Sequence, residues 1–101
     1  MNINITSRKF KAKDSLKSFI TDELLQLQKF HNEILDADVT LHFTHLKDSI
    51  KTAEIKLQLP RKTLHVSESS DEFSKSIATA KDKLVRQLKK VKSKRKAKVR
   101  S

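Results

Sequence analysis

The sequence predicts an α+β fold with the element order β-α-β-β-β-α, in which two helices cover one face of a four-stranded sheet. Two observations lead to this prediction. Four short segments alternate apolar and polar residues, which is typical of strands with one buried face, and two longer segments repeat apolar residues every three or four positions, which is typical of amphipathic helices. The length of 101 residues fits one domain, built as a two-layer sandwich whose second sheet face is open to water.

The first strand and the first helix come from the first 30 residues. Ile3 and Ile5 alternate with polar residues over residues 2–6, which predicts a strand. Asp14 or Ser15 can cap a helix. The apolar stripe of that helix consists of Leu16, Phe19, Ile20, Leu24, Leu27 and Phe30. Phe10 lies in the connection between the two elements, where we expect it to pack over the edge of the core, among the basic residues Arg8, Lys9, Lys11 and Lys13.

A meander of three strands follows. Apolar and polar residues alternate over residues 39–44 and again over residues 53–59, which places one apolar set on the core side. Pro60 ends the second of these strands, because proline cannot donate a hydrogen bond to a neighbouring strand. Leu64 and Val66 begin the last strand.

The last helix has a single buried face. Ser69, Ser70 or Asp71 can cap it, and its apolar residues fall within a stripe of roughly 80°. These residues are Phe73, Ile77, Ala80, Leu84, Leu88 and Val91. Beyond Val91 the stripe ends and the sequence becomes almost wholly basic, which is typical of disorder. We therefore predict a folded domain over residues 1–92 and a disordered basic tail over residues 93–101.

The positive charge is concentrated at one end of the chain. Residues 1–80 contain 12 basic and 11 acidic side chains, whereas residues 81–101 contain 11 basic and 1 acidic. Such a cationic end favours a polyanionic partner, because every phosphate that it neutralises releases condensed counterions. Two alternatives stay open, a tail that only aids solubility and a basic amphipathic helix that lies on anionic lipid.

The polar face of the last helix is the strongest candidate site. On a helical wheel Arg86 lies opposite Ile77, the centre of the buried stripe. Four further cations lie within about 60° of Arg86, namely Lys75, Lys83, Lys89 and Lys90. Asp82 is the one acid that interrupts this face, whereas an ordinary solvated face would contain more acids among these cations. We therefore predict that this row follows the phosphates of RNA.

All five aromatic residues are phenylalanines, and four of them fall on predicted buried stripes. Base stacking is therefore not expected to be the main mode of recognition, which leaves phosphate contacts, 2′-hydroxyl contacts and shape.

The composition excludes most enzymes. The chain has no glycine and no cysteine, so it has no Walker loop, Rossmann fingerprint, disulfide or thiol nucleophile. His42 and His45 would point to opposite faces of a strand, and no carboxylate pair completes a set of metal ligands. We expect no enzymatic activity, cofactor, metal or small-molecule substrate. No apolar run reaches the ~20 residues of a membrane span or resembles a signal peptide. A cytoplasmic protein without a membrane partner, monomeric when free, is expected.

Several segments resemble a known family. The opening Asn4-Ile5-Thr6, the helix segment 16–20 (LKSFI) and above all segment 82–90 (DKLVRQLKK) are similar to the ribosome hibernation promoting factors, also called ribosome-associated inhibitors or the sigma-54 modulation family. The resemblance covers residues 1 to about 93.

The resemblance implies a fold similar to double-stranded-RNA-binding domains and a non-enzymatic role in ribosome hibernation. Family members bind the small ribosomal subunit between its head and body, in free subunits or intact ribosomes. There they block mRNA and tRNA binding and preserve idle ribosomes in stationary phase or stress. By position, the contacts to ribosomal RNA fall on Lys83, Arg86, Lys89 and Lys90, with Lys92 and Lys94 as continuations, and the neighbouring Arg95 completes the predicted set.

Two departures from the family pattern concern function. Glu23 and Gln26 stand where many relatives have lysine, so a contribution of the first helix to RNA binding stays open. The chain ends at Ser101, as expected for a short form without the second domain that pairs ribosomes. Two other functions stay open: a general RNA or DNA chaperone that acts through the tail, and a module that regulates a transcription factor.

Overall fold

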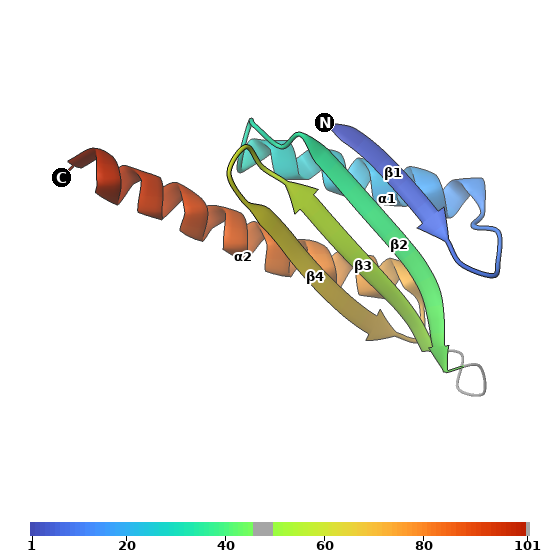
Figure 1. Cartoon of the computed structure of the whole chain (residues 1–101). Coiled ribbons are helices and arrows are strands. Elements are labelled where there is room, and N and C mark those ends of the chain that lie inside the picture. Colours follow the sequence, from blue (N-terminus) through green and yellow to red (C-terminus); the bar gives the residue numbers. More distant parts are fainter. Residues whose placement is uncertain (46–49, 101) are drawn as a thin grey trace.

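The four strands form one mixed sheet in the order β1-β2-β3-β4 (Figure 1). The computed structural model describes the backbone of residues 1–45 and 50–100 and the side chains of residues 1–43 and 50–91. Its elements are β1 (Asn2–Ser7), α1 (Asp14–Leu25), the 3₁₀ turn η1 (Gln26–Lys29), β2 (Asp36–His45), β3 (Ile50–Gln58), β4 (Thr63–Ser70) and α2 (Phe73–Arg100). The predicted order of strands and helices is confirmed.

The strand register places one row of β-branched residues across the sheet. β1 runs parallel to β2 and pairs Ile5 with Val39, and the antiparallel strands β2 and β3 pair Val39 with Ile55. β3 and β4 are also antiparallel and pair Ile55 with Val66. A parallel pair needs a long crossover, which α1 supplies between β1 and β2. Since paired residues share one face of a sheet, the whole row points toward the core.

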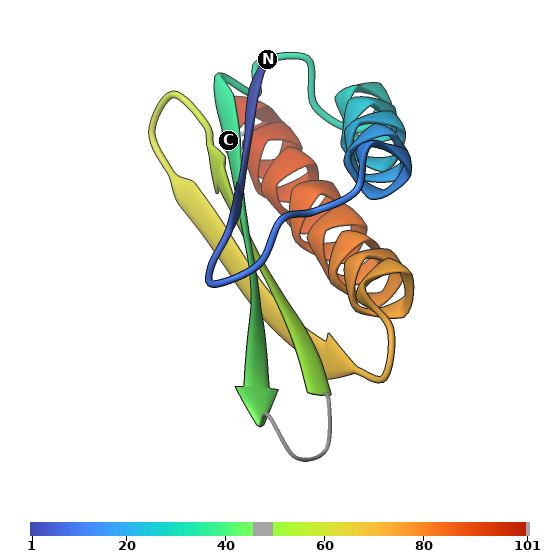
Figure 2. The ribbon, with the colours of Figure 1, turned by 90° about the vertical axis from the view of Figure 1, so that its right-hand side faces the viewer.

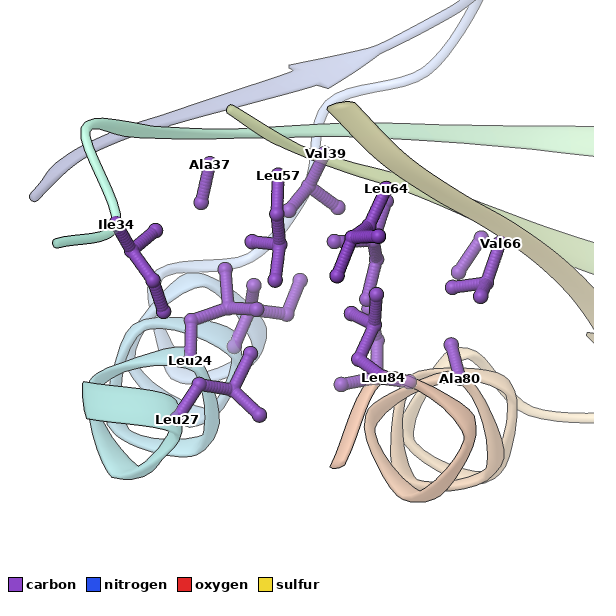
Figure 3. Close-up of a cluster of buried hydrophobic side chains, with 14 of the residues drawn as sticks. Leu24, Leu27, Ile34, Ala37, Val39, Leu57, Leu64, Val66, Ala80 and Leu84 are labelled. Carbon is purple, nitrogen blue, oxygen red and sulfur yellow. The ribbon is translucent and has the colours of Figure 1, made fainter. Parts of the chain in front are cut away.

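Both helices cover the same face of the sheet, as the sequence predicts (Figure 2). Leu24 and Leu27 point toward the sheet from α1 and η1, and Ala80 and Leu84 do so from α2 (Figure 3). Leu57 meets them from β3, and all five side chains are fully buried. Burying large apolar side chains on both layers stabilises this arrangement by roughly 1.5–3 kcal/mol per residue. It also fixes which side of α2 faces outward.

The other sheet face is polar, as predicted. The Asn4 side-chain amide donates to Asp38 across β1 and β2 at 3.1 Å. Glu54 on β3 lies between two histidines, with Nε2 of His42 at 2.9 Å from one carboxylate oxygen and Nε2 of His65 at 3.8 Å from the other. These contacts satisfy polar side chains on this face without an apolar partner layer.

The β1–α1 connection folds back over the core at residues 8–13. Lys9 has a φ of 63°, a left-handed conformation that costs a non-glycine residue about 1–2 kcal/mol. The following Phe10 stacks on Phe73 with ring centroids 5.1 Å apart and meets Phe43 edge-to-face at 5.2 Å. Aromatic contacts of this kind offset the backbone strain. The prediction that Phe10 packs over the edge of the core is confirmed.

The helix starts differ from the predicted caps. Lys13, not Asp14 or Ser15, occupies the cap position of α1, and it makes no side-chain capping bond. Asp14 lies instead in the first turn, where its charge favours the helix dipole. The helix ends at Leu25 and its stripe continues into η1, so the predicted single helix is an α-helix followed by a 3₁₀ turn.

β4 is longer than the sequence indicates, and α2 begins later. Ser69 and Ser70 belong to the strand, since they pair with Thr52 and Lys51 of β3. The hydroxyl groups of Thr52 and Ser69 lie 2.7 Å apart and reinforce this pairing. The helix therefore starts at Phe73, beyond all three predicted capping residues.

α2 continues to Arg100 and extends past the sheet (Figure 1), although we expected a disordered tail from residue 93. Residues 92–100 contain neither glycine nor proline and consist mostly of lysine and arginine, which propagate a helix well. The division of the chain at residue 92 stays a prediction. Within residues 1–45 and 50–100, no helix is long and apolar enough to cross a membrane.

Candidate nucleic-acid interface

α2 has one buried and one cationic face. Ile77, Leu84 and Leu88 are fully buried against the sheet and α1. The five cations that the helical wheel predicts on the outer face are all exposed: Lys75, Lys83, Arg86, Lys89 and Lys90. These cations differ from one another in whether an acidic side chain pairs with them.

Lys75, at the start of α2, is engaged locally. Its Nζ lies 3.2 Å from Asp71, one turn earlier, and this pair holds the pKa of Asp71 below its usual range, first through the hydrogen bond from Lys75. Both side chains are well exposed, and such surface pairs contribute little stability. Lys75 is therefore partly neutralised, and it lies in the first turn of α2, before the rest of the row.

Lys83 forms an ion pair with Glu68 of β4. The Lys83 side chain is 52% exposed and that of Glu68 only 18%, so the carboxylate is the more enclosed partner. The pair attaches the middle of α2 to the edge strand. Lys83 thus contributes less free positive charge than the sequence predicts.

Arg86, Lys89 and Lys90 form the least neutralised part of the row. None of them has an ion pair with any residue that the structure describes. The Nζ atom of Lys89 lies 5.6 Å from the ring centre of Phe30, a cation–π contact that directs this side chain toward the end of η1. The side chains of the other predicted contacts, Lys92, Lys94 and Arg95, lie outside the described residues.

A groove of about 260 Å³ runs between the start of β4 and α2. Lys62 and Lys90 line it together with His65, Gln87 and Leu64. The sequence analysis did not include Lys62 in the site, although it lies in the turn that leads into a strand packed on α2. We call Arg86, Lys89, Lys90 and Lys62 the α2 cationic surface.

Glu23 of α1 and Gln26 of η1 have a structural role. Both accept hydrogen bonds from Nζ of Lys81 on α2, with 2.8 Å to the Glu23 carboxylate. The Lys81 and Glu23 side chains are only 16% and 20% exposed. These contacts join α1 and η1 to α2, which gives the acid and the amide a structural role.

Replacing Glu23 with lysine is expected to lower the free energy of unfolding by about 1–3 kcal/mol, because it removes the acid partner of the enclosed Lys81 ammonium and places another cation beside it. Urea denaturation measures the loss. Asp22→Lys is the matched control, since Asp22 is exposed and adjacent. Equal losses in the two variants would show that the ion pair contributes nothing specific.

Within the part of the chain that the structure describes, no group of three or more His, Asp or Glu side chains could hold a metal ion. His42 and His65 contact different oxygens of Glu54, so they do not converge on one point. The side chain of His45 lies outside the described residues.

Comparison with known proteins decides the family. Residues 3–96 match the family described as "Sigma 54 modulation protein / S30EA ribosomal protein". The chain belongs to this family. The resemblance inferred from segments 16–20 and 82–90 is confirmed, and the match contains all of the α2 cationic surface.

Two solved structures are similar to this member of the sigma-54 modulation and S30EA family. The N-terminal domain of Protein Y from Thermus thermophilus is 26% identical with a TM-score of 0.80, and the match covers 90% of this chain and 99% of that domain. A ribosomal subunit interface protein from Coxiella burnetii is 25% identical with a TM-score of 0.83, covering 92% of this chain and 99% of that one. Both support the family fold.

Proposed function

We propose that this protein is a cytoplasmic, non-enzymatic ribosome hibernation factor. It binds ribosomal RNA of the small subunit at the decoding region, in free subunits and in intact ribosomes, and so blocks mRNA and tRNA and preserves idle ribosomes. The family membership supports a ribosomal partner. The observation that carries the proposal is the row of exposed cations on α2, in which Arg86 and Lys90 have no acid partner among the described residues.

In this proposal the protein acts by occupying the decoding region of the small subunit. The core fixes α2 on the sheet, so the cations of its outer face are presented on a rigid rod. Arg86 can bind a phosphate with two parallel hydrogen bonds, whereas Lys89 and Lys90 act as point charges. Each neutralised phosphate releases counterions, which makes binding favourable without any chemical step.

Co-sedimentation with small subunits tests this function. We expect binding to fall when tRNA and mRNA fill the decoding region, since they compete for the same space. Binding should also weaken with salt, with a log-log slope of roughly 0.7–0.9 for each phosphate contact. Binding that is indifferent to tRNA occupancy, or a flat salt response, would contradict the proposal.

The alternative is a general RNA or DNA chaperone that acts through residues 93–101. One observation favours this alternative. The part of α2 that extends beyond the sheet has no layer to pack on (Figure 1). Deleting residues 93–101 separates the two functions. A chaperone would lose nearly all nucleic-acid binding, whereas a factor that uses the α2 cationic surface would keep most of its ribosome binding.

A further inference from the structure

We propose that a pocket beside the β1–α1 connection binds one unpaired nucleotide of single-stranded RNA, separately from the α2 cationic surface. The pocket has a volume of about 230 Å³ and is lined by Phe10, Phe43, Phe73, Lys11, Lys13 and Ser15, among others. The inference rests on the proposed function only for the choice of RNA over DNA. No part of the proposed function assigns a ligand to this pocket.

The three phenylalanines that line the pocket, which we call its aromatic floor, suit a nucleobase. Phe10 stacks on Phe73, and Phe43 meets both rings edge-to-face at centroid distances of 5.2 and 5.6 Å. The three rings therefore hold one another in place, while Phe10 and Phe43 stay only partly buried. At about 230 Å³ the pocket is smaller than a typical drug-sized site, so it fits one small planar group.

The rim of the pocket suits a phosphate. Lys11 and Lys13 line the pocket, and segment 8–13, to which they belong, also contains the exposed residues Arg8 and Lys9 and no acid. None of them forms an ion pair with a residue that the structure describes. Asp14 follows directly and reduces the local charge by one. An apolar aromatic floor beside cations matches an uncharged base attached to an anionic backbone.

This arrangement gives the phenylalanines a role that the sequence analysis did not. Phe43 lies on a predicted buried stripe, yet in the structure it borders the pocket together with Phe10. An acidic peptide would match the rim but would leave the aromatic floor unused. A base uses both, because stacking on an aromatic ring tolerates any base.

The pocket is distant from the α2 cationic surface. Phe73 is the first residue of α2, and Arg86 lies 13 residues later, about 20 Å along the helix axis. The protein would therefore contact RNA at two points near opposite ends of its folded body. Two such contacts would also fix the orientation of the protein relative to the RNA.

Fluorescence anisotropy with two labelled probes tests the pocket: a uridylate hexamer and a hexamer of the same backbone without bases. We expect the full chain to bind the uridylate about tenfold more tightly than the abasic probe. Phe10→Leu, which keeps an apolar side chain, should abolish this preference. Lys11→Glu with Lys13→Glu should weaken the binding of both probes, and circular dichroism verifies the fold of each variant.

Three results would overturn the proposal: equal affinity for the two probes, unchanged uridylate binding after the Lys11 and Lys13 substitutions, or equal competition by hexaglutamate. An Arg86→Glu, Lys90→Glu variant separates this proposal from the proposed function. It should lose ribosome binding yet keep the preference for uridylate. If it loses that preference, the base site belongs to α2 and the pocket assignment is wrong. If the unsubstituted chain shows the preference but does not bind ribosomes, only the proposed function is removed.

Discussion

Exchanging both Arg86 and Lys90 for glutamate is expected to lower the affinity for small ribosomal subunits about a hundredfold or more. A hydrogen bond to a charged group contributes roughly 1.5–3 kcal/mol, so two lost phosphate contacts multiply to at least that factor. Neither residue has an acid partner among the described residues, so the exchange leaves no carboxylate unpaired. Sedimentation or filter binding at one fixed salt concentration measures the effect.

A control with the same change in net charge separates a local contact from a general loss of positive charge. Lys56 lies on the open sheet face and Lys17 on α1, and both are exposed. Lys17→Glu with Lys56→Glu should weaken binding less than tenfold, because long-range attraction is screened beyond about 10 Å at 0.1 M salt. Equal effects of the two double variants would mean that the α2 cationic surface is assigned to the wrong part of the molecule.

The orientation of α2 was predictable because its pattern is local. Six apolar residues recur at helical spacing, so the stripe alone predicts that Ile77 faces inward and Arg86 outward. The strands were predictable for the same reason, through their alternation. Their lengths were not, because the pairing of Ser69 and Ser70 with β3 depends on where β3 itself begins.

The partners of the cations could not be predicted, since they come from distant parts of the chain. Lys83 is paired by Glu68 only because β4 lies against α2, and Lys81 reaches Glu23 only because α1 packs beside α2. The pocket beside the β1–α1 connection also depends on tertiary contacts. Its basic residues are evident in the sequence, but the left-handed turn at Lys9 that returns Phe10 to Phe73 is not.

Leu84→Ala is expected to lower the free energy of unfolding by about 2–5 kcal/mol, and the melting temperature by roughly 10–20 °C. Leu84 is fully buried on α2 and points toward the sheet in the middle of the core (Figure 3). The substitution removes buried apolar surface and leaves a cavity that rigid neighbours from both layers cannot fill. Thermal and urea unfolding measure the loss.

Val85→Ala is the matched control, because Val85 is the next residue and only partly buried at the margin of the core. Its loss should stay below about 1.5 kcal/mol, since less buried surface is removed and alanine favours the helix. Leu84 and Arg86 lie on opposite sides of α2, so Leu84→Ala protein that is still folded should bind ribosomes as tightly as the original chain. If Val85→Ala lowered the free energy of unfolding more than Leu84→Ala does, α2 would be rotated relative to the sheet. That rotation would also turn Arg86 away from the predicted RNA contacts.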